Sequence, residues 1–139
     1  MTSAYAAIVV ALSSTAFVLT THTHIAATVT AVACCAGAVL LLPVVATTQR
    51  NATVVRSEAI RLVHRYAAAA AFVAVGVAMA VSAYAAIAEA NALIAILGFL
   101  GSVLVIRVLW SKPGAVYGLR QKLLLATLGL WIVSIAMAG

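Results

Sequence analysis

Long runs of apolar residues alternate with short polar turns along this chain. The clearest run extends from Tyr66 to Ala88 and contains no charged residue. About 23 residues, at a rise of 1.5 Å each, make a helix of roughly 34 Å, and the hydrocarbon core of a bilayer is about 30 Å thick. The pattern therefore predicts a membrane-spanning helix.

Four further apolar runs have the same character. We expect five helices in one integral membrane domain that comprises residues 1–139, and the predicted helices cover residues 3–20, 25–47, 57–88, 92–110 and 121–138. Pro43 lies near the end of the second helix, where it would bend or terminate the last turn. The predicted fold class is all-α, a polytopic transmembrane helical bundle with five spans. A four-span version stays open, with the first helix cleaved or the last helix lying in the membrane interface.

The distribution of charge predicts an orientation. Basic residues gather after the second and fourth apolar runs, whereas the turns after the first and third runs carry no Lys or Arg. Because Lys and Arg accumulate in cytoplasmic loops, we expect the N-terminus inside and the C-terminus outside. We also expect Lys112, Arg120 and Lys122 to contact anionic lipid head groups, each contributing at most about 1 kcal/mol.

Composition excludes a soluble domain. Hydrophobic residues make up 67% of the chain and charged residues 7%, against about 25% charged residues in ordinary soluble proteins. A net charge of +6 would suggest nucleic acid as a partner of a soluble protein, but here it indicates orientation in a membrane. The expected partners are the lipid bilayer and other membrane subunits or further copies of the chain, with no nucleic acid. The expected location is a cell inner membrane or the mitochondrial inner membrane.

Small residues form a stripe along the third predicted helix. They recur at every fourth position, and two glycines occupy the fourth predicted helix; the candidate packing residues are Ala70, Ala74, Ala78, Ser82, Ala86, Gly98 and Gly101. Small side chains allow transmembrane helices to approach closely. The stripe therefore predicts a helix-packing surface and no chemistry.

Ionisable residues within a membrane usually mark a path for protons or substrate. None lies in the middle of an apolar run here. Arg107 is the deepest charge, and Glu89 follows the third helix, so either would lie at a pore mouth or at the interface. We predict no catalytic residue. Cys34 and Cys35 are adjacent on one helix and point about 100° apart, which disfavours a disulfide between them.

Three histidines are candidate ligands for a metal or a haem. His22 and His24 have a spacing compatible with a weak metal site, but no acid or cysteine stands beside them, so we predict no metal centre. The segment from Leu62 to Tyr66, with its His64-Arg65 pair, resembles the His-Arg element of haem-bearing anchors such as the succinate dehydrogenase cytochrome b subunit and haem A synthase.

That resemblance implies a haem ligand at His64. The anchor subunits carry a serine three residues before the histidine, whereas this chain has Arg61 there. In the expected topology the other histidines lie across the bilayer, roughly 30 Å away, so a second ligand would have to come from another chain. The alternative is an interfacial histidine among arginines, and no other cofactor is predicted.

Three functions are consistent with these patterns. The leading hypothesis is an accessory or assembly subunit of a larger membrane complex, because small-residue faces dominate and polar interior groups are scarce. The second is a small oligomeric transporter or channel. The third is a membrane haem protein or enzyme that uses His64.

Overall fold

The computed structural model describes residues 2–19, 25–49, 58–111 and 115–138. The described residues form five α-helices: α1 (Thr2–Leu19), α2 (Ile25–Gln49), α3 (Glu58–Ala88), α4 (Ala92–Leu109) and α5 (Ala115–Ala138). The all-α prediction is confirmed.

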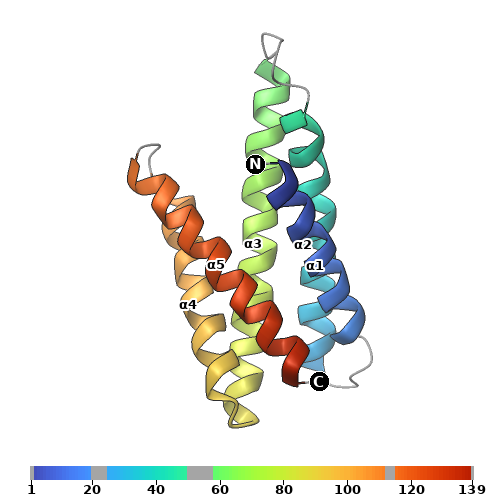
Figure 1. Ribbon diagram of the computed structural model, residues 1–139, viewed down its shortest axis with the longest axis vertical. Coiled ribbons are helices and arrows are strands. Elements are labelled where there is room, and N and C mark those ends of the chain that lie inside the picture. Colours follow the sequence, from blue (N-terminus) through green and yellow to red (C-terminus); the bar gives the residue numbers. More distant parts are fainter. Residues whose placement is uncertain (1, 20–24, 50–57, 112–114, 139) are drawn as a thin grey trace.

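The helices run alternately up and down (Figure 1). The long helix α3 lies between α2 and α4, α1 packs against α2, and α5 leaves the far end of α4 and crosses in front of α3 toward α1. The arm formed by α4 and α5 diverges from α1, α2 and α3 toward the end at which α3 begins. We call this the basic end, because all five described Lys and Arg residues lie near it, and we call the other the opposite end.

Within the described residues, four helices are long and apolar enough to cross a membrane. They are Ala26–Val44, Glu58–Ala88, Ala92–Leu109 and Val116–Ala138. In α1, the part with described side chains is shorter, Ala6–Ala16. These lengths and compositions indicate an integral membrane protein.

A tight turn joins α3 to α4 at the opposite end. The amide of Asn91 donates to the carbonyl of Ala86 over 2.8 Å, and the amide of Ala90 donates to the carbonyl of Ile87 over 3.2 Å. This pair of bonds is the Schellman arrangement, which places Ala90 at a position with φ of 56° where glycine is usual. The Asn91 side chain then caps α4 by accepting from the amide of Ile94. Helices α3 and α4 therefore form an antiparallel hairpin.

Two helices extend further than their sequences predict. Helix α5 begins at Ala115 instead of residue 121, because every residue of this segment except Gly118 tolerates a helix at little cost, and one glycine costs about 1 kcal/mol. Helix α2 continues through Pro43 to Gln49, so Pro43 does not end it. Helix α3 begins at Glu58, and the expected first residue, Ser57, lies outside the described residues.

The buried residues form two clusters. The larger joins all five helices and contains Leu12, Cys34, Val75, Met79 and Trp131 among others, with Ile94 contributed by α4. The smaller, Val105, Val108 and Leu124, holds α4 and α5 together near the basic end, with Phe72 of α3 packed against it. The diverging arm therefore has a hydrophobic core of its own.

Candidate functional site

Helix α4 approaches α3 closely at two glycines. A Cβ atom added to Gly98 would lie 2.5 Å from the carbonyl oxygen of Met79 and 2.9 Å from the Cβ of Ala83. A Cβ added to Gly101 would overlap the end of the Met79 side chain. The two glycines therefore pack against Met79 and Ala83. Met79 directly follows Ala78, and Ala83 directly follows Ser82, in the sequence of the small-residue stripe.

The serine of α4 reinforces this contact. The Ser102 hydroxyl lies 2.8 Å from the carbonyl oxygen of Gly98 in its own helix and 3.2 Å from that of Gly76 in α3. Its proton is satisfied within the helix pair, so no polar group is left for lipid or for a ligand.

A tryptophan of α5 forms the polar contact at the centre of the bundle. Trp131 is fully buried and donates from Nε1 to the Oγ of Ser82 over 2.9 Å. Ser82 donates in turn to the carbonyl of Met79 over 3.0 Å. Every donor in this short series has an acceptor, as an apolar interior requires.

The small-residue stripe of α3 does not face a single neighbour. Four residues turn a helix by about 400°, so each successive member is displaced by about 40° around the axis. Ala70 is exposed, Ala74 is half-buried, and Ala78, Ser82 and Ala86 are buried. The stripe therefore begins on the outer surface and ends in the interior, near Trp131.

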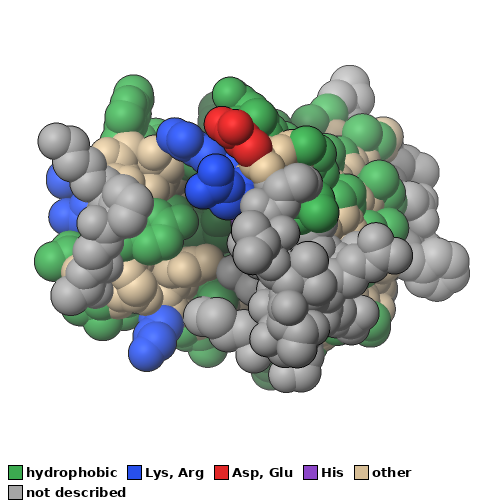
Figure 2. Space-filling view, turned by 90° about the horizontal axis from the view of Figure 1, so that it is seen from above, with side chains coloured by type: hydrophobic (Ala, Val, Ile, Leu, Met, Phe, Trp, Pro, Cys, Tyr) green, Lys and Arg blue, Asp and Glu red, His purple; other side chains and the backbone are tan. Residues whose placement is uncertain are grey.

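The basic end carries every charged residue of the described chain except Glu89. Arg61, Arg65, Arg107 and Lys122 are exposed, Arg120 is half-buried, and Glu58 is the only described acid near them. Figure 2 looks onto this end and shows Lys and Arg side chains beside a recess with a hydrophobic floor, between the two parts of the bundle. Lys112, the third residue expected to contact head groups, lies outside the described residues.

One arginine also ties α5 to the end of α4. Arg120 donates from its guanidinium to the Oγ of Ser111, and the Ser111 hydroxyl donates to the carbonyl of Arg107. A cation at the carboxyl end of a helix is favourably placed against the helix dipole. This contact holds α5 beside α4 where the arm diverges from α3.

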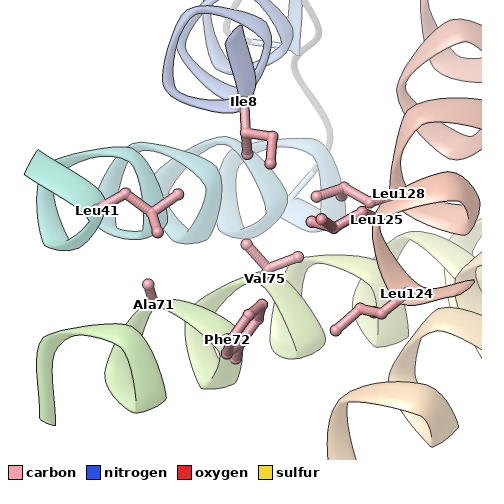
Figure 3. A pocket seen from close by; sticks show the side chains of 8 residues that line it. All are labelled: Ile8, Leu41, Ala71, Phe72, Val75, Leu124, Leu125 and Leu128. Atoms are coloured by element: carbon pink, nitrogen blue, oxygen red, sulfur yellow. The ribbon is translucent and has the colours of Figure 1, made fainter. Parts of the chain in front are cut away.

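An apolar crevice lies between the arm and the rest of the bundle. Figure 3 shows its lining side chains converging from four helices: Ile8, Leu41, Ala71, Phe72, Val75, Leu124, Leu125 and Leu128. Its lining is apolar, and the space it encloses, about 10 Å³, is no larger than one water molecule needs. It is therefore a narrow apolar groove.

The remaining candidate residues lie at the two ends of the molecule. His64 is half-buried near the basic end, while Arg107 is exposed at that end and Glu89 is exposed at the opposite end. His22 and His24 lie outside the described residues. Within the described ranges, no three His, Cys, Asp or Glu side chains come together as a metal site would require, and Cys34 and Cys35 are both free thiols.

Sequence reasoning missed Trp131 and the crevice. A signal for the first was present, because an indole N–H in a membrane helix needs an acceptor and Ser82 is the only serine or threonine of α3. The crevice had no such signal. Its residues are ordinary apolar side chains on helices that are far apart in the sequence.

Comparison with known proteins found no match: no protein-family model, no curated protein and no solved structure matches this chain. The functional argument therefore depends on the residues and geometry described above.

Proposed function

We propose that this chain is an accessory or assembly subunit of a larger membrane complex and acts through helix packing. The observation that carries the proposal is the outer face of α3, which we define as Tyr66, Ala70, Val73, Val77, Ala80 and Tyr84. All six are exposed although α3 is the central helix of the molecule. Their alternating spacings of four and three residues form a straight seam, and its two alanines allow a partner helix to approach.

The proposed topology has five spans, with the N-terminus inside and the C-terminus outside. Helix α1 has 18 residues, a length of about 27 Å, and runs alongside the others. The positive charge of the basic end supports an inside location for that end. Tyr66 and Tyr84 are 69% and 80% exposed. They are about 27 Å apart along α3, which fits aromatic side chains at the two interfaces. We propose an inner membrane, of a cell or of a mitochondrion.

The first test is extraction of the tagged chain from its own membrane in mild detergent, followed by native mass spectrometry. We expect other subunits to co-purify with the wild-type chain. Replacing Ala70 and Ala80 together by Leu should abolish that association, because the larger side chains block close helix approach. The matched control replaces Ala36 and Ala126 by Leu; both are exposed, on α2 and α5.

Substitutions at Ala70 and Ala80 test association with a partner without disturbing the core of the chain, because both residues are exposed. Ala78 of the small-residue stripe has no exposed surface, so Leu at that position would disturb the core of the chain itself. A monodisperse monomer whose composition is the same for wild type and the Ala70/Ala80 variant would contradict the proposal.

The same preparation separates the two other hypotheses. A homo-oligomer without other subunits would favour a small transporter or channel, to be followed by flux measurements in liposomes. A haem absorption band that disappears in a His64→Ala variant would favour the haem protein.

A further inference from the structure

We infer that the crevice between the α4–α5 arm and helices α1, α2 and α3 binds one acyl chain of an anionic phospholipid, whose phosphate is held by Arg61 and Arg65 of α3 together with Arg120 of α5. This site does not depend on the proposed subunit role.

The lining of the crevice selects hydrocarbon. Its eight lining residues are apolar and present no polar surface. A water molecule needs two to four polar partners, so water has no stable position there. A transmembrane helix is about 10–12 Å wide and cannot enter so narrow a groove. A single acyl chain lies along it, against the three half-buried lining residues Ile8, Phe72 and Leu125. Within a bilayer, lipid chains surround the open side of the groove.

The positions of the arginines connect the crevice to a phosphate. Arg65 and Arg61 precede Phe72 by seven and eleven residues, so all three lie within about 20° of the same face of α3. Arg120 precedes Leu124 by four residues and shares its face within about 40°. Along the helix axes, Arg65 lies roughly 10 Å and Arg120 roughly 6 Å closer to the basic end than these lining residues.

Charge complementarity identifies the head group. The basic end carries five described cations against Glu58 alone. Arg61 and Arg65 are exposed, and a guanidinium has five N–H donors, so Arg120 keeps donors for a phosphate while it bonds Ser111. Arginine binds phosphate oxygens in pairs of parallel hydrogen bonds. The zwitterionic head group of phosphatidylcholine adds a positive charge that this end disfavours.

The test uses the purified full chain in mild detergent and native mass spectrometry with two lipids of identical acyl chains, phosphatidylglycerol and phosphatidylcholine. We expect one phosphatidylglycerol per chain to survive conditions that remove phosphatidylcholine. Excess inorganic phosphate should not displace it, because phosphate alone lacks the acyl chain. Displacement by phosphate would assign the site to a free anion and overturn the proposal.

Two pairs of variants locate the site. Arg65→Gln should weaken phosphatidylglycerol binding about fivefold. The control Arg107→Gln should leave it unchanged, because Arg107 lies on α4 and no residue of α4 lines the crevice. Leu125→Phe should fill the half-buried side of the crevice and weaken binding about tenfold. The control Leu123→Phe changes a neighbouring residue that is exposed and lines no part of the crevice.

Three further results would overturn the proposal. The first is equal retention of the two lipids, and the second is a Leu125→Phe variant that binds like wild type while circular dichroism shows it folded. The third is a stable dimer that is cross-linked through the Leu125→Cys variant. The last result would assign the crevice to a second copy of the chain.

Discussion

Trp131 donates a hydrogen bond from Nε1 to the Oγ of Ser82, and this 2.9 Å contact joins α5 to α3 across 49 positions of the sequence. It fixes the point at which α5 crosses α3. Leu128, one turn before Trp131 on α5, lines the apolar crevice. The position of one crevice wall thus depends on a polar contact deep in the bundle.

We expect Ser82→Ala to lower the free energy of unfolding by about 1–2 kcal/mol, because it leaves the buried indole N–H of Trp131 without an acceptor. Trp131→Phe removes the donor but leaves Ser82 bonded to the carbonyl of Met79. A double-mutant cycle should give a coupling energy of about 0.6–1.7 kcal/mol.

Unfolding in sodium dodecyl sulfate, monitored by circular dichroism, measures the free energy of unfolding of each variant and hence the coupling energy. Ser134→Ala is the control, since the Ser134 hydroxyl bonds only the carbonyl of Leu130 in its own helix. A coupling energy of zero would show that the Trp131–Ser82 contact does not stabilise the fold.

Ala90→Gly should stabilise the protein by about 1 kcal/mol. Ala90 has a φ of 56°, a left-handed conformation that costs a residue with a Cβ atom about 1–2 kcal/mol and costs glycine little. Ala90→Val should be destabilising for the same reason. Thermal unfolding in detergent compares the stability of the two variants with that of the wild type. An Ala90→Val variant as stable as Ala90→Gly would contradict the prediction.

Gly98→Ala should destabilise the α3–α4 pair by about 1–3 kcal/mol, because the added methyl group meets the backbone of Met79 and forces the helices apart. Gly129→Ala is the matched control. A Cβ at Gly129 would meet nothing within 4 Å, so this change should be neutral or stabilising by up to about 1 kcal/mol. Equal effects of the two substitutions on the unfolding midpoint would contradict the close approach at Gly98.

The proposed topology predicts which end of the molecule a membrane-impermeant maleimide reaches in intact cells. In a background where Cys34 and Cys35 are replaced by Ala, cysteines at Glu89 and Ala138 should be labelled from outside. A cysteine at Lys122 should react only after permeabilisation. Labelling at Glu89 without labelling at Ala138 would support the four-span alternative, in which α5 lies in the interface.

Much of the helical framework could be predicted from the sequence. The apolar run of α3 ends at Ala88 as expected, because Glu89 and Asn91 supply the polar turn and cap. The start of α5 at Ala115 was not predicted, because helix propensity differs too little among the residues of an interfacial segment to show where the helix begins. Pro43 likewise lies within α2 although it lacks an amide proton.

The candidate site was less predictable. From Ala70 to Ala86, every fourth residue of α3 is small, and the sequence shows this pattern. Successive members are displaced by about 40° around the helix, so the packing of neighbouring helices decides which of them are buried. Ala70 is exposed and Ala86 is buried, although both belong to the same stripe. Gly98 packs against Met79 and Ala83, each one position after a member of the stripe.

The sequence by itself determined that this chain is an all-α membrane protein and that its charges gather at alternate turns, because both follow from run length and from where Lys and Arg occur. Only the tertiary structure decided the divergence of the α4–α5 arm, the Trp131–Ser82 contact and the apolar crevice. These features depend on how side chains from four helices fill space together, and no periodicity along one helix carries that information.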